Sequence, residues 1–224
     1  TPVERLRLSS IEPWDVTPDL LELWADSRLC RHLHVPLQSG CHPTLRRMGR
    51  RHTPDEFARM AAQVRAHIPE TSLTTDAIVG FPGETEAEFA ESMAFIQEVA
   101  FSRLHVFKYS RRPGTVAANL PQQVAPQVAQ QRSDRLIALS HDMARRFHQR
   151  FLQQEVQVLF ESVQVEDGIT VWDGLTDNYL RVLVRSERDL GNVLAPVLCT
   201  TADVVGLTGE LAFAAAERAC FDKH

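Results

Sequence analysis

The stretch "TTDAIVGFPGETEAEF", residues 74–89, begins as a strand-like run and ends as a helical pattern. The run stops at Val79, where the glycine- and proline-containing turn "GFPG" begins at Gly80. Thr85 and Glu88 then have the spacing of a capping box at a helix start. A strand that turns sharply into a helix is typical of α/β proteins, which bind ligands at the carboxyl ends of their strands. The stretch therefore predicts an α/β fold with a site near Gly80.

The same alternation extends to both sides of this stretch. Hydrophobic periodicity predicts strands over 6–9, 33–37, 72–79 and 104–107, and helices over 18–27, 54–68 and 86–99. Thr17 and Thr53 each precede a proline, which marks the starts of two of these helices. We expect the four strands to be parallel neighbours in this order, with their following loops opening on one side.

A different pattern follows residue 120. A connector rich in proline and glutamine leads into a helix predicted over 128–151, and beyond it the apolar period changes to two. Five short alternating stretches lie between 155 and 211, which predicts a small sandwich or an OB-like barrel. The predicted domains are thus 1–152, 153–213 and a tail over 214–224.

Composition restricts the class of protein. The chain has 224 residues, 44% of them hydrophobic, with a formal net charge of -5, and no apolar run reaches the length of a membrane span. Its four cysteines form no CxxC pair and no secretory signal opens it, which indicates reduced thiols and a cytoplasmic protein without a disulfide scaffold. The chain opens within a strand pattern, so we expect it to be a fragment.

Charge is distributed unevenly along the chain. Residues 1–152 carry 19 Lys+Arg against 17 Asp+Glu, a net of +2, whereas residues 153–213 carry 3 against 10, a net of -7. The second region thus lacks the basic surface expected of an RNA-binding domain. Either Tyr179, Arg181 and Arg185 form a local basic patch there, or this region adds little affinity for RNA.

Polar residues follow each predicted strand. Because the carboxyl ends of parallel strands share one side of a barrel, these residues are expected to converge. Hydroxyls, amides and carboxylates suit a ribose and an amino-acid head group, and glycines let the backbone approach an adenine. The alternative is that these are ordinary turns. The candidates are Ser9, Ser10, Glu12, Gln38, Ser39, Asp76, Gly80 to Gly83, Lys108, Tyr109, Ser110, Arg111 and Arg112.

Histidines alternate on one predicted strand, which raises the question of a metal site. His32 and His34 share a strand face, and Cys41 and His42 follow nearby. Zinc prefers compact pairs and a closed set of ligands. We therefore predict packed histidines, or histidines that face the strand-end side of the barrel, and no metal site.

Three segments resemble the strand-end signatures of the radical S-adenosylmethionine methylthiotransferases: "HLHVPLQSG", "TTDAIVGFPGETEAEF" and "LHVFKYSRRPGTVAA". The resemblance covers nearly the whole chain. Within that family "RLSSIEP", "LHVF" before "YSRRPGT", and "GLTDNYLRV" resemble most the branch that acts on N6-threonylcarbamoyladenosine beside the tRNA anticodon. The resemblance implies the later part of an open TIM-like radical SAM barrel, followed by a small β-barrel called TRAM.

The family's cofactors follow from the same resemblance. Its members use S-adenosylmethionine and two [4Fe-4S] clusters, and a radical derived from the cofactor abstracts hydrogen from adenine C2 before sulfur and methyl are installed. The CxxxCxxC motif and the three further cysteines that hold the clusters are not in this chain. The fragment alone is therefore expected to bind no cluster and to be inactive.

The resemblance also implies roles for single residues, although no catalytic residue is assigned. Expected contacts to S-adenosylmethionine are Ser10, Glu12, Gln38, Ser39, Asp76, Gly80 and Tyr109. Position and charge, not the resemblance, predict contacts to RNA from Arg111, Arg112, Tyr179 and Arg181, and the alternative for Arg111 and Arg112 is a solvated charged face. The expected partners are tRNA, a reductant and a sulfur donor, but no membrane, and the oligomeric state is not set.

Four alternatives stay open. The first two are family branches acting on isopentenyladenosine in tRNA or on a ribosomal protein. The third is a noncatalytic RNA-binding module. The fourth is a metabolic α/β-barrel enzyme with a catalytic Lys or His at a strand end, where Lys108 is the only lysine.

Overall fold

A computed structural model describes residues 3–8, 10–166 and 168–212, so the expected tail over 214–224 lies outside the described residues. The chain divides into two compact units, Thr1–Met143 and Ala144–His224. This division falls inside the long helix α5, Pro126–Gln149, so the last turns of α5 belong with the second unit.

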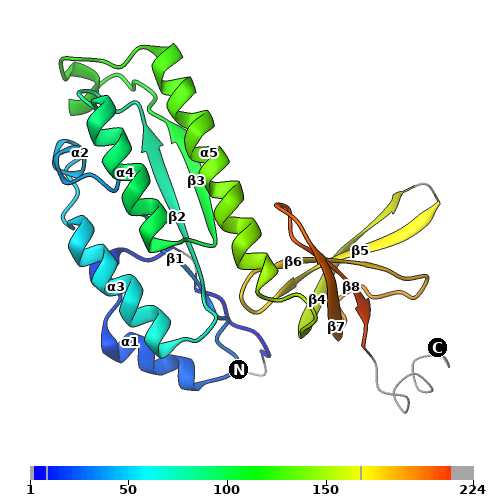
Figure 1. Cartoon of the computed structure of the whole chain (residues 1–224). Helices are drawn as coiled ribbons and strands as arrows, with labels where there is room; N and C mark the ends of the chain where they lie inside the picture. Colours follow the sequence, from blue (N-terminus) through cyan, green and yellow to red (C-terminus); the bar gives the residue numbers. More distant parts are fainter. Residues whose placement is uncertain (1–2, 9, 167, 213–224) are drawn as a thin grey trace. The chain divides into compact units, whose positions relative to one another are not determined.

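A parallel sheet with the strand order β1-β2-β3 forms the centre of the first unit (Figure 1). Its strands are β1 His32–His34, β2 Ser72–Val79 and β3 Arg103–Lys108. Leu33 pairs with Leu73, and Asp76 pairs with His105. The predicted order and parallel direction are therefore confirmed for three of the four expected strands.

The strand expected over 6–9 does not form in the described residues, so this prediction is wrong. Leu6 and Ser10 make only isolated parallel bridges, to Leu29 and His34 respectively. These two partners lie on either side of the start of β1, so the bridges do not join into a continuous ladder. Ser10 still lies beside β1, because the Ile11 amide donates to the His34 carbonyl at 3.1 Å.

β1 is shorter than the strand expected over 33–37 because the chain bulges after His34. His34 pairs with Thr74, and the next bridge joins Gln38 to Ala77. One chain thus advances from 34 to 38 while its partner advances from 74 to 77, which inserts one extra residue. Pro36 lies in this bulge, where it has no amide hydrogen to give to a ladder.

The Thr75 hydroxyl bridges the bulge. It donates to the Val35 carbonyl at 2.7 Å and accepts from the Leu37 amide at 2.9 Å, in a fully buried position. Thr75→Val preserves the shape but leaves both backbone groups without this partner. We expect the free energy of unfolding to fall by about 2 kcal/mol in urea titration. Thr75→Ser keeps the hydroxyl and should lose clearly less, and an equal loss in both variants would contradict this explanation.

Helices α3, Pro54–His67, and α4, Glu86–Val99, begin where the sequence predicts. Both start with a complete capping box, formed by Thr53 with Glu56 and by Thr85 with Glu88. Each box satisfies backbone amides that a helix start leaves unpaired. α4 has the predicted bounds, and α3 ends one residue earlier than expected.

Helices α3, α4 and α5 pack against one face of the sheet (Figure 1). Leu33, Leu73 and Val79 share a hydrophobic core with side chains from all three helices: Phe57, Val64, Phe89, Ile96, Leu136 and Met143. Side chains alternate between the faces of a strand, so His34 and Asp76 point to the opposite face. They are partly exposed there, which leaves a polar and accessible sheet face.

Short helices connect these elements. The helix predicted over 18–27 is divided into two pieces, and a helix follows β1 that the sequence analysis missed. The short helices are η1 Pro13–Asp15, α1 Pro18–Glu22, η2 Leu23–Ala25, α2 His42–Arg47 and η3 Val116–Asn119.

The second unit is a closed barrel with the strand order β4-β5-β6-β8-β7. Its strands are β4 Glu155–Glu166, β5 Ile169–Thr176, β6 Arg181–Arg185, β7 Leu194–Ala202 and β8 Leu207–Leu211. Inward-facing Val158, Phe160 and Val182 form its core together with Phe147 from the last turns of α5. The predicted small barrel is confirmed, and the sandwich alternative is not. In neither unit does a described helix have the length and apolar character to cross a membrane.

Candidate functional site at the strand ends

Four polar side chains gather on the open face of the parallel sheet. Ser10 makes an isolated bridge to His34 on β1, and Asp76 on β2 pairs with His105 on β3. His34 Nε2 lies 3.4 Å from Asp76 Oδ2, and the His34 and His105 rings meet edge to face at 5.8 Å. The Asp76 side chain keeps 26% of its surface exposed, so a ligand can reach its carboxylate. The structure thus places His34 and His105, which the sequence did not single out for this site, beside Asp76, and Ser10 lies next to His34.

A chain of hydrogen bonds orients this group. The Thr74 hydroxyl lies 3.0 Å from both His32 Nε2 and His34 Nδ1. A hydroxyl has a single hydrogen, so it donates to one ring and accepts from the other. If His34 Nε2 carries its proton toward Asp76, then Nδ1 accepts from Thr74, and His32 Nε2 donates to Thr74. Burial lowers the pKa of His32 to about 3, so that ring is neutral, as this chain of bonds requires.

Gln38 and Tyr109 present buried polar atoms at the same strand ends. Gln38 has a φ of 70° and is 8% exposed, and its Oε1 has no hydrogen-bond partner among the described residues. The same holds for the Tyr109 hydroxyl, whose ring packs edge to face on Phe81 at 5.2 Å. Buried polar atoms are nearly always hydrogen-bonded in folded proteins. Both atoms are therefore suited to contact a ligand.

Glu12 lies after the first segment of the chain, as expected. Its carboxylate accepts from Arg50 Nη1 at 3.2 Å. Because both side chains stay partly exposed, this ion pair is weak and can exchange for a ligand contact.

Ser39 and Gly80 have structural roles instead of open ligand contacts. Ser39 is 1% exposed, and its hydroxyl accepts from the Cys41 amide and donates to Ser92 on α4. Gly80 has a φ of 73°, and a Cβ built on it would lie 2.7 Å from Cβ of Ala129 on α5. A larger side chain at 80 would therefore clash with α5 and would not block a nucleoside.

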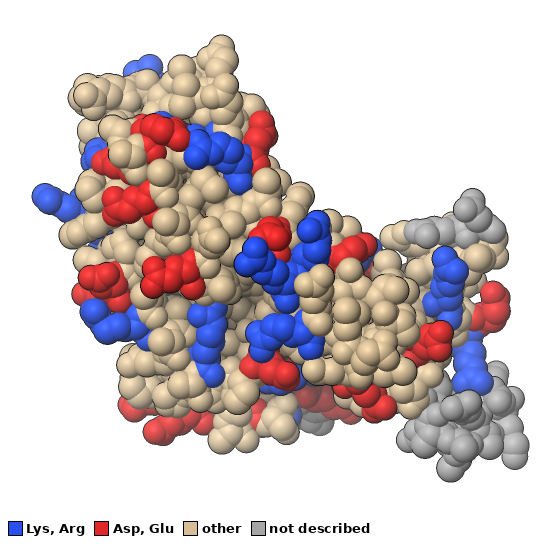
Figure 2. Space-filling view, in the orientation of Figure 1, with Lys and Arg blue, Asp and Glu red and all other residues tan. Residues whose placement is uncertain are grey.

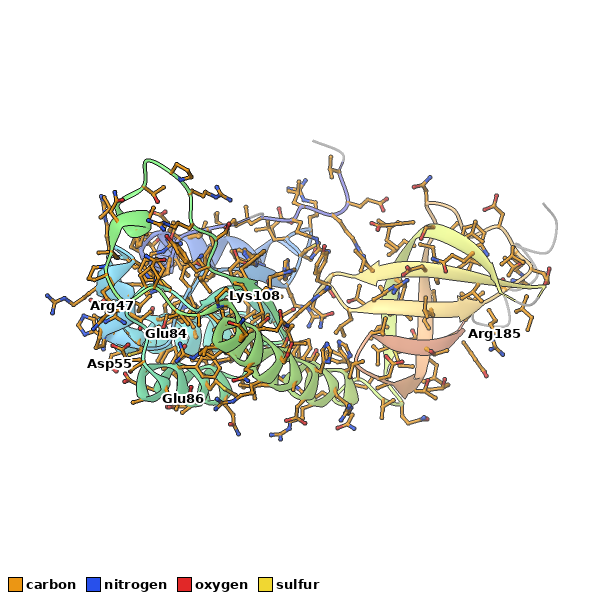
Figure 3. All side chains as sticks on the ribbon, turned by 90° about the horizontal axis from the view of Figure 1, so that it is seen from above. Arg47, Asp55, Glu84, Glu86, Lys108 and Arg185 are labelled. Atoms are coloured by element: carbon orange, nitrogen blue, oxygen red, sulfur yellow. The ribbon has the colours of Figure 1, made fainter. Side chains whose placement is uncertain are left out.

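The Gly80 amide donates a hydrogen bond to Glu84, which forms a buried ion pair with Arg132. This ion pair was not predicted from the sequence. Glu84 Oε2 accepts from the Gly80 amide at 2.7 Å and from Arg132 Nη1 at 2.8 Å. The Glu84 and Arg132 side chains are only 2% and 6% exposed. Arg132 Nε also lies 3.5 Å from Glu86 Oε2, and Figure 3 shows Glu84 and Glu86 at one end of the sheet-and-helix unit. Helix α5 is thereby attached to the turn after β2.

The four residues expected to contact RNA differ in availability. Arg111 and Arg112 are exposed in the loop after β3, and Tyr179 is 41% exposed in the barrel. Arg181 instead forms an ion pair with Asp173 on the neighbouring strand β5, with a 2.6 Å contact from Nη2. Figure 2 shows basic and acidic side chains interspersed on the visible face. Arg181 thus contributes less positive charge to an RNA surface than expected.

Lys108 at the end of β3 does not reach the open sheet face. It pairs with Val79, whose side chain lies in the helix-facing core, and its Nζ donates to Gln130 of α5 at 2.6 Å. This arrangement disfavours a metabolic enzyme that uses Lys108 as its catalytic strand-end group.

The described cysteines do not suit an iron–sulfur cluster. Cys30, Cys41 and Cys199 are buried, and burial raises the pKa of Cys41 and raises that of Cys199 to about 11. Cluster ligands are thiolates, so a raised thiol pKa opposes binding. Within the described residues no three His, Cys, Asp or Glu side chains form a group that could hold a metal.

We expect the 224-residue chain to take up no cluster. After anaerobic incubation with iron and sulfide and then desalting, it should show no visible charge-transfer absorption. Stoichiometric bound iron that is lost in a Cys30→Ser, Cys41→Ser variant would contradict this expectation.

Residues 2–96 match the Radical SAM superfamily, and these residues include β1, β2 and most of α4. The first unit therefore carries part of a Radical SAM domain. Among solved structures, coproporphyrinogen III oxidase (HemN) from Escherichia coli, described as a Radical SAM enzyme, aligns with a TM-score of 0.53 at 21% identity. The alignment covers 62% of this chain and 32% of that chain, and it supports the fold alone.

Sequence relatives lie within the tRNA methylthiotransferases. The threonylcarbamoyladenosine tRNA methylthiotransferase MtaB of Bacillus subtilis is 40% identical over 190 residues, which is 84% of this chain and 42% of that protein. The MtaB protein of Thermotoga maritima is 40% identical over 75% of this chain and 39% of its own length. A tRNA-2-methylthio-N(6)-dimethylallyladenosine synthase of Thermoanaerobacter sp. is 35% identical over 93% of this chain and 44% of its own length. The chain thus spans less than half the length of these relatives.

Proposed function

We propose that this chain is part of an enzyme that methylthiolates C2 of N6-threonylcarbamoyladenosine in tRNA by radical S-adenosylmethionine chemistry. The observation that carries tRNA methylthiolation is the 40% identity to the Bacillus subtilis protein over 84% of this chain. The identity extends across most of both units, so the similarity is not limited to a common cofactor domain. A tRNA-2-methylthio-N(6)-dimethylallyladenosine synthase is 41% identical over 70% of this chain, so identity alone does not select the substrate. The separate "RLSSIEP" and "GLTDNYLRV" segments favour the threonylcarbamoyladenosine branch.

The strand-end residues fit S-adenosylmethionine by their chemistry. The Asp76 carboxylate offers acceptors to ribose hydroxyls, and Ser10 lies on the same sheet face. The unpartnered Gln38 Oε1 and Tyr109 hydroxyl offer further polar contacts. When bound next to a reduced cluster, the cofactor supplies the radical. The residues of this chain position the cofactor and the adenine and limit access of water.

Cluster ligands come from outside these 224 residues in this proposal, because the chain has no suitable thiolate set among its described residues. The full-length protein would bind two [4Fe-4S] clusters and would work in the cytoplasm with a reductant and a sulfur donor. The closed barrel would serve as a TRAM-type RNA-binding domain. Exposed Arg111 and Arg112 would approach tRNA phosphates.

Deleting the gene that encodes this chain tests the proposal in cells. Nucleosides from total tRNA should lose 2-methylthio-N6-threonylcarbamoyladenosine, and N6-threonylcarbamoyladenosine should accumulate. The matched internal reference is 2-methylthio-dimethylallyladenosine, which should stay unchanged. Loss of that nucleoside instead would assign the chain to the branch of the tRNA-2-methylthio-N(6)-dimethylallyladenosine synthases, which are 32% to 41% identical to it.

A further inference from the structure

A cavity of about 510 Å³ lies beside the strand-end site and has no role in the proposed cofactor contacts. Its lining consists of Pro13, Trp14, Arg51, His52 and Glu56. The first two residues follow Glu12, and the other three lie around the start of α3. The cavity is thus formed by the loop after the first segment and by the turn that leads into α3.

Aromatic and guanidinium planes dominate this lining. Trp14 is 44% exposed, so part of its ring is accessible to a ligand in the cavity. The Arg51 guanidinium lies 5.8 Å from the centre of the Trp14 ring, and the His52 ring lies 6.4 Å from it. A flat aromatic ligand can stack on Trp14 and receive contacts from Arg51.

Two residues that line the cavity, His52 and Glu56, carry hydrogen-bond acceptors. His52 Nε2 lies 3.2 Å from the Leu37 carbonyl, which can only accept, so Nε2 carries the proton. Burial lowers the pKa of His52, so the ring is neutral and Nδ1 is an acceptor. Nδ1 is buried and has no hydrogen-bond partner among the described residues, in a side chain that is 5% exposed. The hydrogen bonds of the Glu56 carboxylate to Thr53 go to Oε2, and Oε1 has none in the described part of the chain.

We propose that this cavity binds a nucleobase of single-stranded RNA that carries an exocyclic amine, stacked on Trp14. The planes of the Trp14 ring and the Arg51 guanidinium lie beside the base, and the free Glu56 Oε1 accepts from its exocyclic amine. The same chemistry could be presented by a free nucleoside. The lining favours a polynucleotide, because Arg51 is exposed and forms no ion pair within the described residues.

Arg51 differs from the neighbouring arginines Arg47 and Arg50, which support the fold through ion pairs. Arg47 pairs with Glu88 at 2.7 Å, and Arg50 pairs with Glu12 at 3.2 Å. Exposed guanidiniums without carboxylate partners are the groups that contact phosphates. This inference rests on the proposed function in so far as the RNA is taken to be the anticodon loop of the substrate tRNA.

Binding of an anticodon stem-loop RNA to the 224-residue chain tests the inference without cluster or cofactor. Titration should quench tryptophan fluorescence, and Trp14→Phe should remove that quenching while Trp24 and Trp172 remain. By anisotropy of labelled RNA, Trp14→Ala should weaken binding about tenfold, and Trp14→Phe should keep most of the affinity because a ring can still stack. Arg51→Lys keeps the positive charge but removes the planar guanidinium. If Arg51 contacts the base through this plane, Arg51→Lys should weaken RNA binding, whereas a contact made by charge alone would be kept.

Two results would overturn the inference. The first is unchanged RNA affinity in Trp14→Ala that has wild-type thermal stability. The second is quenching by adenosine or S-adenosylmethionine at lower concentration than by RNA, which would assign the cavity to a free nucleoside. Both are separable from failure of the proposed function, which would appear as unchanged nucleosides after gene deletion.

Discussion

Arg132→Met is expected to lower the free energy of unfolding of the first unit by about 4 kcal/mol, because it leaves a buried carboxylate without its cation. Glu84 would keep its hydrogen bond from the Gly80 amide but would lose the 2.8 Å contact to Arg132. Burial already raises the pKa of Glu84, and Arg132 opposes that effect. Without Arg132 the carboxyl should take up a proton, and α5 should lose its attachment to the turn after β2.

Urea titration followed by circular dichroism measures this loss. Arg135→Met is the matched control, since Arg135 lies on the same helix and its ion pair with Glu86 is exposed. Exposed pairs contribute little, so the control should lose less than about 1 kcal/mol. The double variant Glu84→Met, Arg132→Met should recover part of the loss, because no unpaired charge stays buried. Equal losses for Arg132→Met and Arg135→Met would contradict the buried role of this pair.

Asp76→Asn should weaken S-adenosylmethionine binding to the full-length enzyme about 10- to 100-fold, the usual effect of losing a hydrogen bond to a charged acceptor. The substitution keeps the shape of the side chain and removes its charge. Asp55→Asn is the control, because Asp55 is an exposed carboxylate on α3, labelled in Figure 3. Equilibrium dialysis with labelled cofactor gives both affinities. Wild-type affinity in a folded Asp76→Asn enzyme would exclude Asp76 from the cofactor site.

Local signals in the sequence predicted the regular elements well. The capping boxes at Thr53 and Thr85 fix two helix starts, and the bounds of β2 and α4 agree with the prediction. Capping depends on residues that are three positions apart, so a sequence shows it directly. The change of apolar period from helical to alternating likewise identified the second unit as a small β structure.

Features that depend on distant contacts could not be predicted in this way. The bulge after His34 requires the Thr75 hydroxyl from another strand, and the role of Gly80 is set by Ala129 on α5. The Glu84–Arg132 pair joins residues that are 48 positions apart. Gly80 was therefore predicted to contact a ligand, but a Cβ at this position would meet Ala129 on α5.

In the candidate site, too, some features could be predicted from the local sequence and others depend on distant contacts. Asp76 could be found because it lies near the end of a predicted strand, but its contact with His34 depends on register. His105 was missed because only the pairing of β2 with β3 places it opposite Asp76. The alternation of His32 and His34 was the sequence signal for this group, and it correctly predicted that both side chains lie on one face of β1.

Purified full-length enzyme with reconstituted clusters allows the proposed methylthiolation to be measured as a product. It would be incubated with S-adenosylmethionine, a reductant, a sulfur donor and tRNA that carries unmodified C2 on N6-threonylcarbamoyladenosine. Mass spectrometry of the digested tRNA should show 2-methylthio-N6-threonylcarbamoyladenosine, and little or none with the Asp76→Asn enzyme. Unmodified tRNA after complete cluster loading, or methylthiolation of dimethylallyladenosine only, would contradict the proposed function.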